Sequence, residues 1–164
     1  MHVSAINVTL SFIGALVFHE LGHFLAARAC RVRVTQVGFG CGPKLFGFRV
    51  KGVEYQLRLL PLGAYVRMDM SGLQRRPLPQ QLFVLLAGIA VNLILGVIAW
   101  GTFFGTLNLV LALANLFPLY QQDGWKSGMV IFRHIFKRPT PLLDWSFTLS
   151  AGLIGLILLM RAIF

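Results

Sequence analysis

An apolar run from Ile6 to Ala27 contains the pattern H-E-x-x-H, formed by His19, Glu20 and His23. On a helix, residues four positions apart lie on one face, so both imidazoles can reach one zinc ion while Glu20 beside them acts as a general base. Ionisable groups are rare inside a membrane-spanning helix and usually serve a function there. The alternatives are a surface charge pair on a soluble helix and a haem or structural metal bound by the same histidines. The run predicts a metal site, because lipid does not solvate an unused carboxylate.

The composition is that of a membrane protein. Of the 164 residues, 57% are hydrophobic and 12% are charged, and the mean hydropathy is +0.75. A helix that crosses a bilayer needs about 20 apolar residues, and residues 6–27, 82–104 and 142–164 meet that requirement. We therefore predict a single, mainly α-helical membrane domain over residues 1–164. Residues 6–27 are expected to be a retained span, since no basic residue precedes them as in a signal peptide.

A fourth apolar segment, residues 106–120, is interrupted near Pro118. The polar residues Gln121, Gln122 and Asp123 follow directly, so this helix is expected to end or unwind at membrane depth. Non-helical backbone is tolerated there only where it lines a protein interior or a water-filled cavity. Asp123 is therefore expected to lie in a site, and the chain is expected to have about four transmembrane segments.

Basic residues are concentrated in two connections between these segments. Ten of the 15 lie between Arg28 and Arg76 and four lie between Lys126 and Arg138, and the formal net charge is +10. Under the positive-inside rule both connections face the cytoplasm and both termini face outside. We expect a multi-pass protein of a bacterial cytoplasmic membrane whose site opens towards the cytoplasm. A basic surface beside anionic lipid headgroups requires no nucleic acid partner.

The first connection, at about residues 34–67, contains a β-hairpin pattern. Apolar and polar residues alternate at 46–51 and at 54–59, on either side of Gly52, as in two strands with one apolar face. That face is predicted to lie against the bilayer or the helices. An ordinary cytoplasmic hairpin with its own small core would have the same pattern.

Gly88, Asn92 and Gly96 recur at every fourth position of the second long segment and so lie on one helix face. Small residues let another helix backbone come close, and an asparagine can hydrogen-bond to it. The stripe predicts a packing seam or, alternatively, a face that contacts a bound substrate segment.

Together these residues resemble the site-2 protease family of intramembrane zinc metalloproteases. That family pairs H-E-x-x-H with a later N-x-x-P-x-x-x-x-D-G element, which this chain has from Asn115 to Gly124. The segment L-P-L-G-A-Y-V, from Leu60 to Val66, is similar to the family's L-P-L-G-G-Y-V. Ala87, Gly88 and Asn92 are similar to its A-G-x-x-x-N helix. The resemblance covers nearly the whole chain and identifies a compact member without a PDZ or CBS domain.

The resemblance implies a ligand set and a base. His19, His23 and Asp123 would hold one Zn²⁺ per chain, and Glu20 would take a proton from water whose pKa falls towards about 7 at such an ion. The implied activity is hydrolysis of peptide bonds within or near transmembrane segments of membrane-protein substrates. An extended substrate could pair with the hairpin edge near residues 53–59.

Asn92 and Asn115 are implied to position the substrate or to stabilise the transition state. Near the third ligand the chain departs from the family pattern, because Gln122 and Trp125 stand where other residues are frequent beside D-G. Two other functions could use the same metal ligands. A metal transporter would need a polar path, of which residues 82–104 offer little, and a non-catalytic membrane scaffold would not need Glu20.

Overall fold

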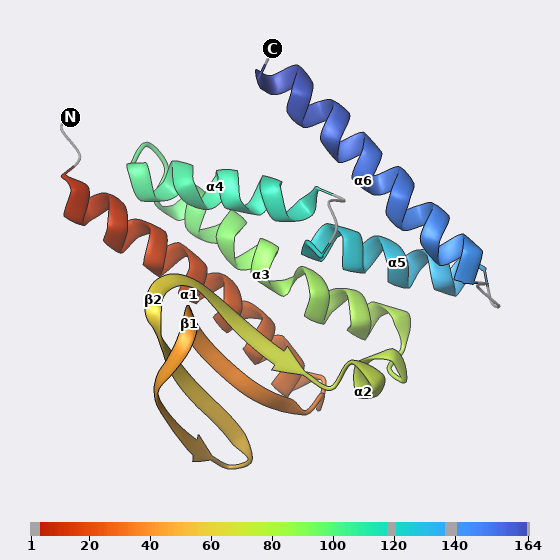
Figure 1. Cartoon of the computed structure of the whole chain (residues 1–164), viewed down its shortest axis with the longest axis horizontal. Helices are drawn as coiled ribbons and strands as arrows, with labels where there is room; N and C mark the ends of the chain where they lie inside the picture. The colour runs from red at the N-terminus through yellow and green to blue at the C-terminus, as the bar shows by residue number, and fades with distance from the viewer. Residues whose placement is uncertain (1–3, 118–120, 137–140, 164) are drawn as a thin grey trace.

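The computed structural model describes residues 4–117, 121–136 and 141–163. Helices α1, α3 and α4 lie side by side, the hairpin of β1 and β2 covers one side of α1, and α5 continues beyond the end of α4 (Figure 1). The fold is mainly helical with one small sheet, as predicted. The elements are α1 (Ala5–Ala29), β1 (Val34–Val50), β2 (Val53–Met68), α2 (Met70–Gln74), α3 (Leu78–Ile98), α4 (Phe103–Leu116), α5 (Asp123–Ile135) and α6 (Pro141–Ile163).

Two helices in the described ranges, α1 with 25 residues and α3 with 21, are long and apolar enough to cross a membrane. At 1.5 Å per residue they are about 38 and 32 Å long, against a hydrocarbon core of about 30 Å. The Ser4 hydroxyl caps the start of α1 by accepting a hydrogen bond from the Asn7 N–H. Proline in the first turn favours the start of α3. The first two predicted segments are therefore helices, although α3 ends six residues before residue 104.

The interrupted apolar segment predicted at residues 106–120 is shorter than a span. Its helix, α4, has 14 residues and rises about 21 Å, less than the hydrocarbon core. It begins at Phe103 because the Thr102 hydroxyl caps it by accepting a hydrogen bond from the Gly105 N–H at 3.0 Å. The predicted interruption near Pro118 lies outside the described residues. Helix α5, which begins at Asp123, was not anticipated as a separate element.

The predicted hairpin is present, with its turn at Lys51 and Gly52, whose φ angles are 48° and 81°. Residues 54–57 of β2 pair with residues 46–49 of β1. Both strands bend, so residues 36–39 of β1 also have partners both among residues 54–57 and among residues 64–67. Because residues 54–57 are already paired on both sides, the expectation that a substrate pairs along residues 53–59 is wrong for that stretch.

The stripe on α3 serves as a packing seam. Gly88 faces α1, Gly96 lies against the Leu109 side chain of α4, and Asn92 between them is wholly buried. Absence of side chains at the two glycines lets the three helices approach closely. A buried apolar cluster packs the helices against the sheet at the C-terminal end of α1, which is its basic end because Arg28 lies in the last turn. It comprises Ala26, Ala27, Val32, Val34, Val53, Leu73, Val84, Leu85 and Ala87.

The close approach of α3 and α4 predicts that Gly105→Ala lowers the free energy of unfolding by about 1–3 kcal/mol, the usual cost of overpacking. A Cβ at this position would meet the backbone carbonyl of Ala99, which belongs to the tight turn between the helices. Thermal unfolding in detergent micelles measures the effect. Gly14→Ala is the matched control, because its Cβ would meet only the Phe104 ring at 3.6 Å, an ordinary contact. Equal midpoints for the two variants would contradict the packing described.

Candidate metal centre

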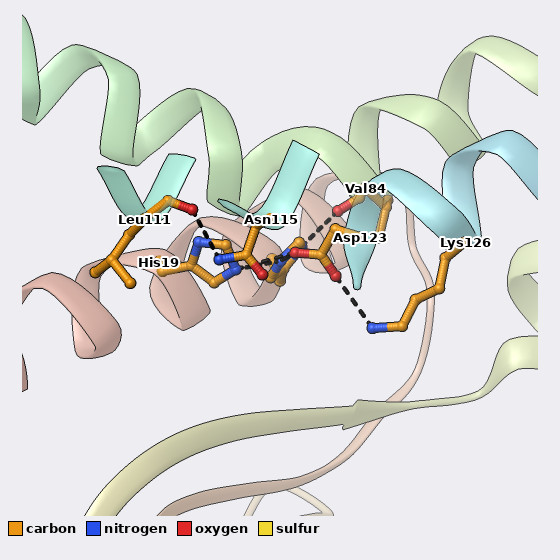
Figure 2. Close-up of polar contacts among 7 residues, drawn as sticks. His19, Val84, Leu111, Asn115, Asp123 and Lys126 are labelled. Atoms are coloured by element: carbon orange, nitrogen blue, oxygen red, sulfur yellow. Dashed lines mark hydrogen bonds and ion pairs between the residues drawn. The ribbon is translucent and has the colours of Figure 1, made fainter. Parts of the chain in front are cut away.

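Three predicted ligands converge although about 100 residues separate them in sequence. His19 and His23 stand one turn apart on α1, and Asp123 is the first residue of α5. Asp123 Oδ2 lies 3.0 Å from His19 Nε2 and 2.9 Å from His23 Nε2 (Figure 2). The two Nε2 atoms are 3.2 Å apart, and all three side chains are buried. The donor atoms lie within 4.8 Å of one another, close enough to share one ion.

The donor set fits a cation. His23 Nδ1 lies 2.8 Å from the carbonyl oxygen of Val84, an acceptor, so Nδ1 carries the proton and donates it. In a neutral imidazole, Nε2 then presents a lone pair towards the Asp123 carboxylate and towards His19 Nε2. Such a convergence of electron pairs is repulsive unless a proton or a metal ion lies among them, and the arrangement is one that a cation would stabilise. The Nδ1 hydrogen bond is also the outer contact that orients a metal-binding histidine.

Gly88 provides the surface on which the two rings rest. A Cβ there would meet His23 Nε2, and it would lie 2.7 Å from His19 Cε1 and Nε2. Any side chain at this position would therefore push the rings out of place. The sequence placed Gly88 in a packing seam, and the structure shows that its contact is with the imidazoles.

Asp123 is held by the packing of the first turn of α5. The backbone at Gly124 lies against the carbonyl of Leu116 at the end of α4, with no room for a Cβ. Lys126, one turn further on, donates to Asp123 Oδ1 at 3.1 Å. Sequence reasoning missed this lysine, although its spacing of three residues from Asp123 on a helix would have placed both on one face.

Glu20 faces a different neighbour from the histidines. It lines an apolar cavity of about 400 Å³ between α1 and the sheet, and the backbone of Val66 in β2 lies towards its carboxylate. Gln56 and Tyr55 contribute the other polar groups of the lining. Most of the wall is aromatic or aliphatic, including Phe24, Phe39, Phe46 and Phe48.

The two predicted asparagines lie in different surroundings. Asn92 has no exposed surface, which favours its reading as a packing residue of the seam over a substrate contact. Asn115 is half-buried and donates from Nδ2 to the carbonyl of Leu111 at 3.0 Å (Figure 2). Within the described residues, no hydrogen bond to its side-chain oxygen is present.

Comparison with known proteins adds an independent observation. Residues 7–104, more than half of the chain, match Peptidase family M50. The chain belongs to this family. The match includes His19, Glu20 and His23, whereas Asp123 lies beyond it. The resemblance predicted from the motifs is thereby confirmed, and with it a membrane-embedded metalloprotease family associated with zinc.

Relatives from several bacteria carry zinc metalloprotease names. The chain is 46% identical over 70 residues to zinc metalloprotease RasP of Geobacillus kaustophilus, covering 40% of this chain and 17% of that protein. A relative from Clostridium perfringens is named as a zinc metalloprotease by inference. It is 37% identical over 97 residues, which are 54% of this chain and 29% of that protein. A similarly named relative from Helicobacter pylori is 33% identical over 140 residues, which are 75% of this chain and 39% of that protein. This member of family M50 thus spans well under half the length of these relatives.

The clustering predicts that His19→Ala, His23→Ala and Asp123→Ala each lower the zinc content of the purified protein, because a three-ligand site loses much of its affinity with any one ligand. Metal analysis after dialysis against a weak chelator measures the loss. Asp69→Ala is the control, since Asp69 is exposed at the start of α2. Full zinc retention by Asp123→Ala would refute its place as third ligand.

Proposed function

We propose that this chain is the peptidase core of an intramembrane zinc protease that hydrolyses peptide bonds within or near transmembrane segments of membrane proteins. The observation that carries the proposal is the position of Glu20. The neighbouring residues His19 and His23 on α1 belong to the candidate metal-binding cluster, while Glu20 itself lines the apolar cavity beside the sheet. A general base between a metal-binding cluster and an apolar cleft is the arrangement that hydrolysis of an apolar peptide requires.

His19, His23 and Asp123 would hold one zinc ion per chain. When bound, zinc supplies Lewis-acid chemistry, because it polarises a carbonyl group and lowers the pKa of water towards about 7. The protein contributes the orientation of the ligands through the Val84 carbonyl and the Gly88 backbone.

Glu20 would move the proton. Its carboxylate accepts a proton from the attacking water, and it then delivers that proton to the nitrogen of the leaving amine. The apolar walls around Glu20 exclude bulk water from this exchange and strengthen its electrostatic interactions.

The cavity favours an extended, apolar substrate segment. A transmembrane helix has its carbonyl groups hydrogen-bonded, so it must unwind locally before attack. Residues 64–67 pair with residues 36–39 on one side, and their other side lies towards Glu20 at Val66. Backbone hydrogen bonds along that side would hold the unwound segment next to the base. Asn115 would orient the same segment through its side-chain oxygen.

The topology proposed is four transmembrane segments with both termini outside, where α4 and α5, which continues beyond it, together form the third segment (Figure 1). Basic residues at the end of α1 and just before α3 lie together at one end of the bundle, where the Arg76 guanidinium donates to the Arg31 carbonyl at 2.9 Å. The opposite turn, residues 99–102, has no charged residue. This asymmetry supports a cytoplasmic orientation of the basic end.

Replacing Glu20 separates the chemistry from the assembly of the site. Glu20→Gln should lower cleavage of a tagged single-pass substrate by about 10²–10⁴-fold, because an amide cannot accept the proton. Zinc content and substrate co-purification should stay near normal. Glu54→Gln is the matched control, since Glu54 lies on the hairpin and pairs with Lys44.

Two outcomes would count against the proposal. Near-normal product from Glu20→Gln, with contaminating proteases excluded, would refute the general-base role. Absence of any product from the wild-type protein together with metal transport into proteoliposomes would favour a transporter.

The topology predicts the labelling of single cysteines introduced into a protein whose Cys30 and Cys41 are replaced by serine. Cysteine at Lys51 or Arg75 should react with an impermeant maleimide only from the cytoplasmic side, and cysteine at Gly101 only from outside. Labelling of intact cells and of inverted vesicles measures the two sides. The reverse labelling pattern would contradict the proposed orientation.

A further inference from the structure

The two oxygens of the Asp123 carboxylate have different partners. Oδ2 faces the Nε2 atoms of His19 and His23, at 3.0 and 2.9 Å. Oδ1 points the other way and accepts a hydrogen bond from Lys126 Nζ at 3.1 Å (Figure 2). The side chain of Asp123 is 9% exposed and that of Lys126 is 40% exposed. The lysine thus reaches from a more open position to the far side of a buried ligand.

An ion pair at this spacing on a helix surface is common and contributes little by itself. This pair differs because one partner is a buried carboxylate that faces two imidazoles. The backbone at Gly124 is packed against Leu116, which fixes the first turn of α5. The remaining freedom of Asp123 is rotation of its carboxylate, and the hydrogen bond to Lys126 removes that freedom.

We propose that Lys126 is a positioning residue that keeps Asp123 a one-oxygen ligand. The inference rests on the metal site proposed above and adds a role within it. A carboxylate can bind a metal through one oxygen or through both. Because Lys126 engages Oδ1, Asp123 presents only Oδ2 to the ion between the histidines. The fourth position of a tetrahedral site then stays open for water and substrate.

Removal of the ammonium group should release the carboxylate. In Lys126→Met, Asp123 can rotate or bind through both oxygens, so the ligand is less well oriented and the open position is lost. Outer contacts of this kind typically change metal affinity or activity by about 10–100-fold when removed. Lys126→Arg retains a charged donor at this place and should stay within a few fold of the wild type.

The first test is zinc affinity, measured with the purified full chain in detergent against a chromophoric chelator. We expect the zinc affinity of Lys126→Met to differ from that of the wild type by about 10–100-fold and that of Lys126→Arg to stay near wild type. Lys51→Met is the control, because it removes a lysine in the hairpin turn instead. Wild-type affinity in Lys126→Met would overturn the inference. A wild-type protein that binds no zinc would instead refute the proposed metal site itself.

The second test is the visible spectrum of the protein loaded with Co²⁺, which reports coordination number. The wild-type protein should give the intense bands of four-coordinate cobalt, and Lys126→Met should give weaker bands of higher coordination. This measurement does not depend on enzymatic activity, and the result for the wild-type protein does not depend on the folding of any variant. Weak bands in the wild-type protein, or equal spectra for both, would contradict a one-oxygen Asp123 held by Lys126.

Discussion

Burial of His19, His23 and Asp123 inside an apolar bundle is the constraint on which the rest of the structure depends. Buried polar groups are costly unless they are paired, so the neighbouring helices must bring partners to them. One turn of α3 supplies one such partner and the space that the two rings need. The Val84 carbonyl accepts from His23 Nδ1, and four residues later Gly88 leaves space for both rings. Both contacts therefore hold α3 close to α1, together with the apolar packing of Val84, Leu85 and Ala87.

Helix α1 separates the proposed metal ligands from the proposed general base. Successive residues of an α-helix are about 100° apart around its axis, so Glu20 cannot share the face of His19. It turns instead to the sheet, where Val66 and the aromatic residues form the cavity. Helix α1 therefore has the metal cluster on one side and the cleft on the other. A substrate bound on the sheet side would contact Glu20 first. It would come close to the proposed metal ligands only where Glu20 lies next to the histidines on the helix.

The local parts of this arrangement could be predicted from the residues themselves, whereas the one distant contact that was predicted, that of Asp123 with the two histidines, came from the family resemblance. The pattern at His19 to His23 and the alternation around Gly52 depend on neighbours within one element, and both have the predicted secondary structure. The bend of the strands depends on contacts of the folded sheet and on positive φ angles of 90° at Gly40 and 84° at Gly42. Helix α5 was missed because its short amphipathic pattern follows a proline, and the pairing of Lys126 depends on where that helix begins.

The depth of the centre explains why the sheet folds back along α1. His23 lies six residues before Ala29, the last residue of the helix, or about 9 Å from its basic end, and His19 lies about 15 Å from it. A hairpin that starts beyond that end must return towards the bilayer to reach Glu20. In the proposed topology its apolar residues meet lipid as well as lining the cavity, and the exposures of 61% for Phe46 and 51% for Phe48 are those expected of side chains solvated by hydrocarbon. The cleft thus has the polarity of the transmembrane segment that we propose it receives.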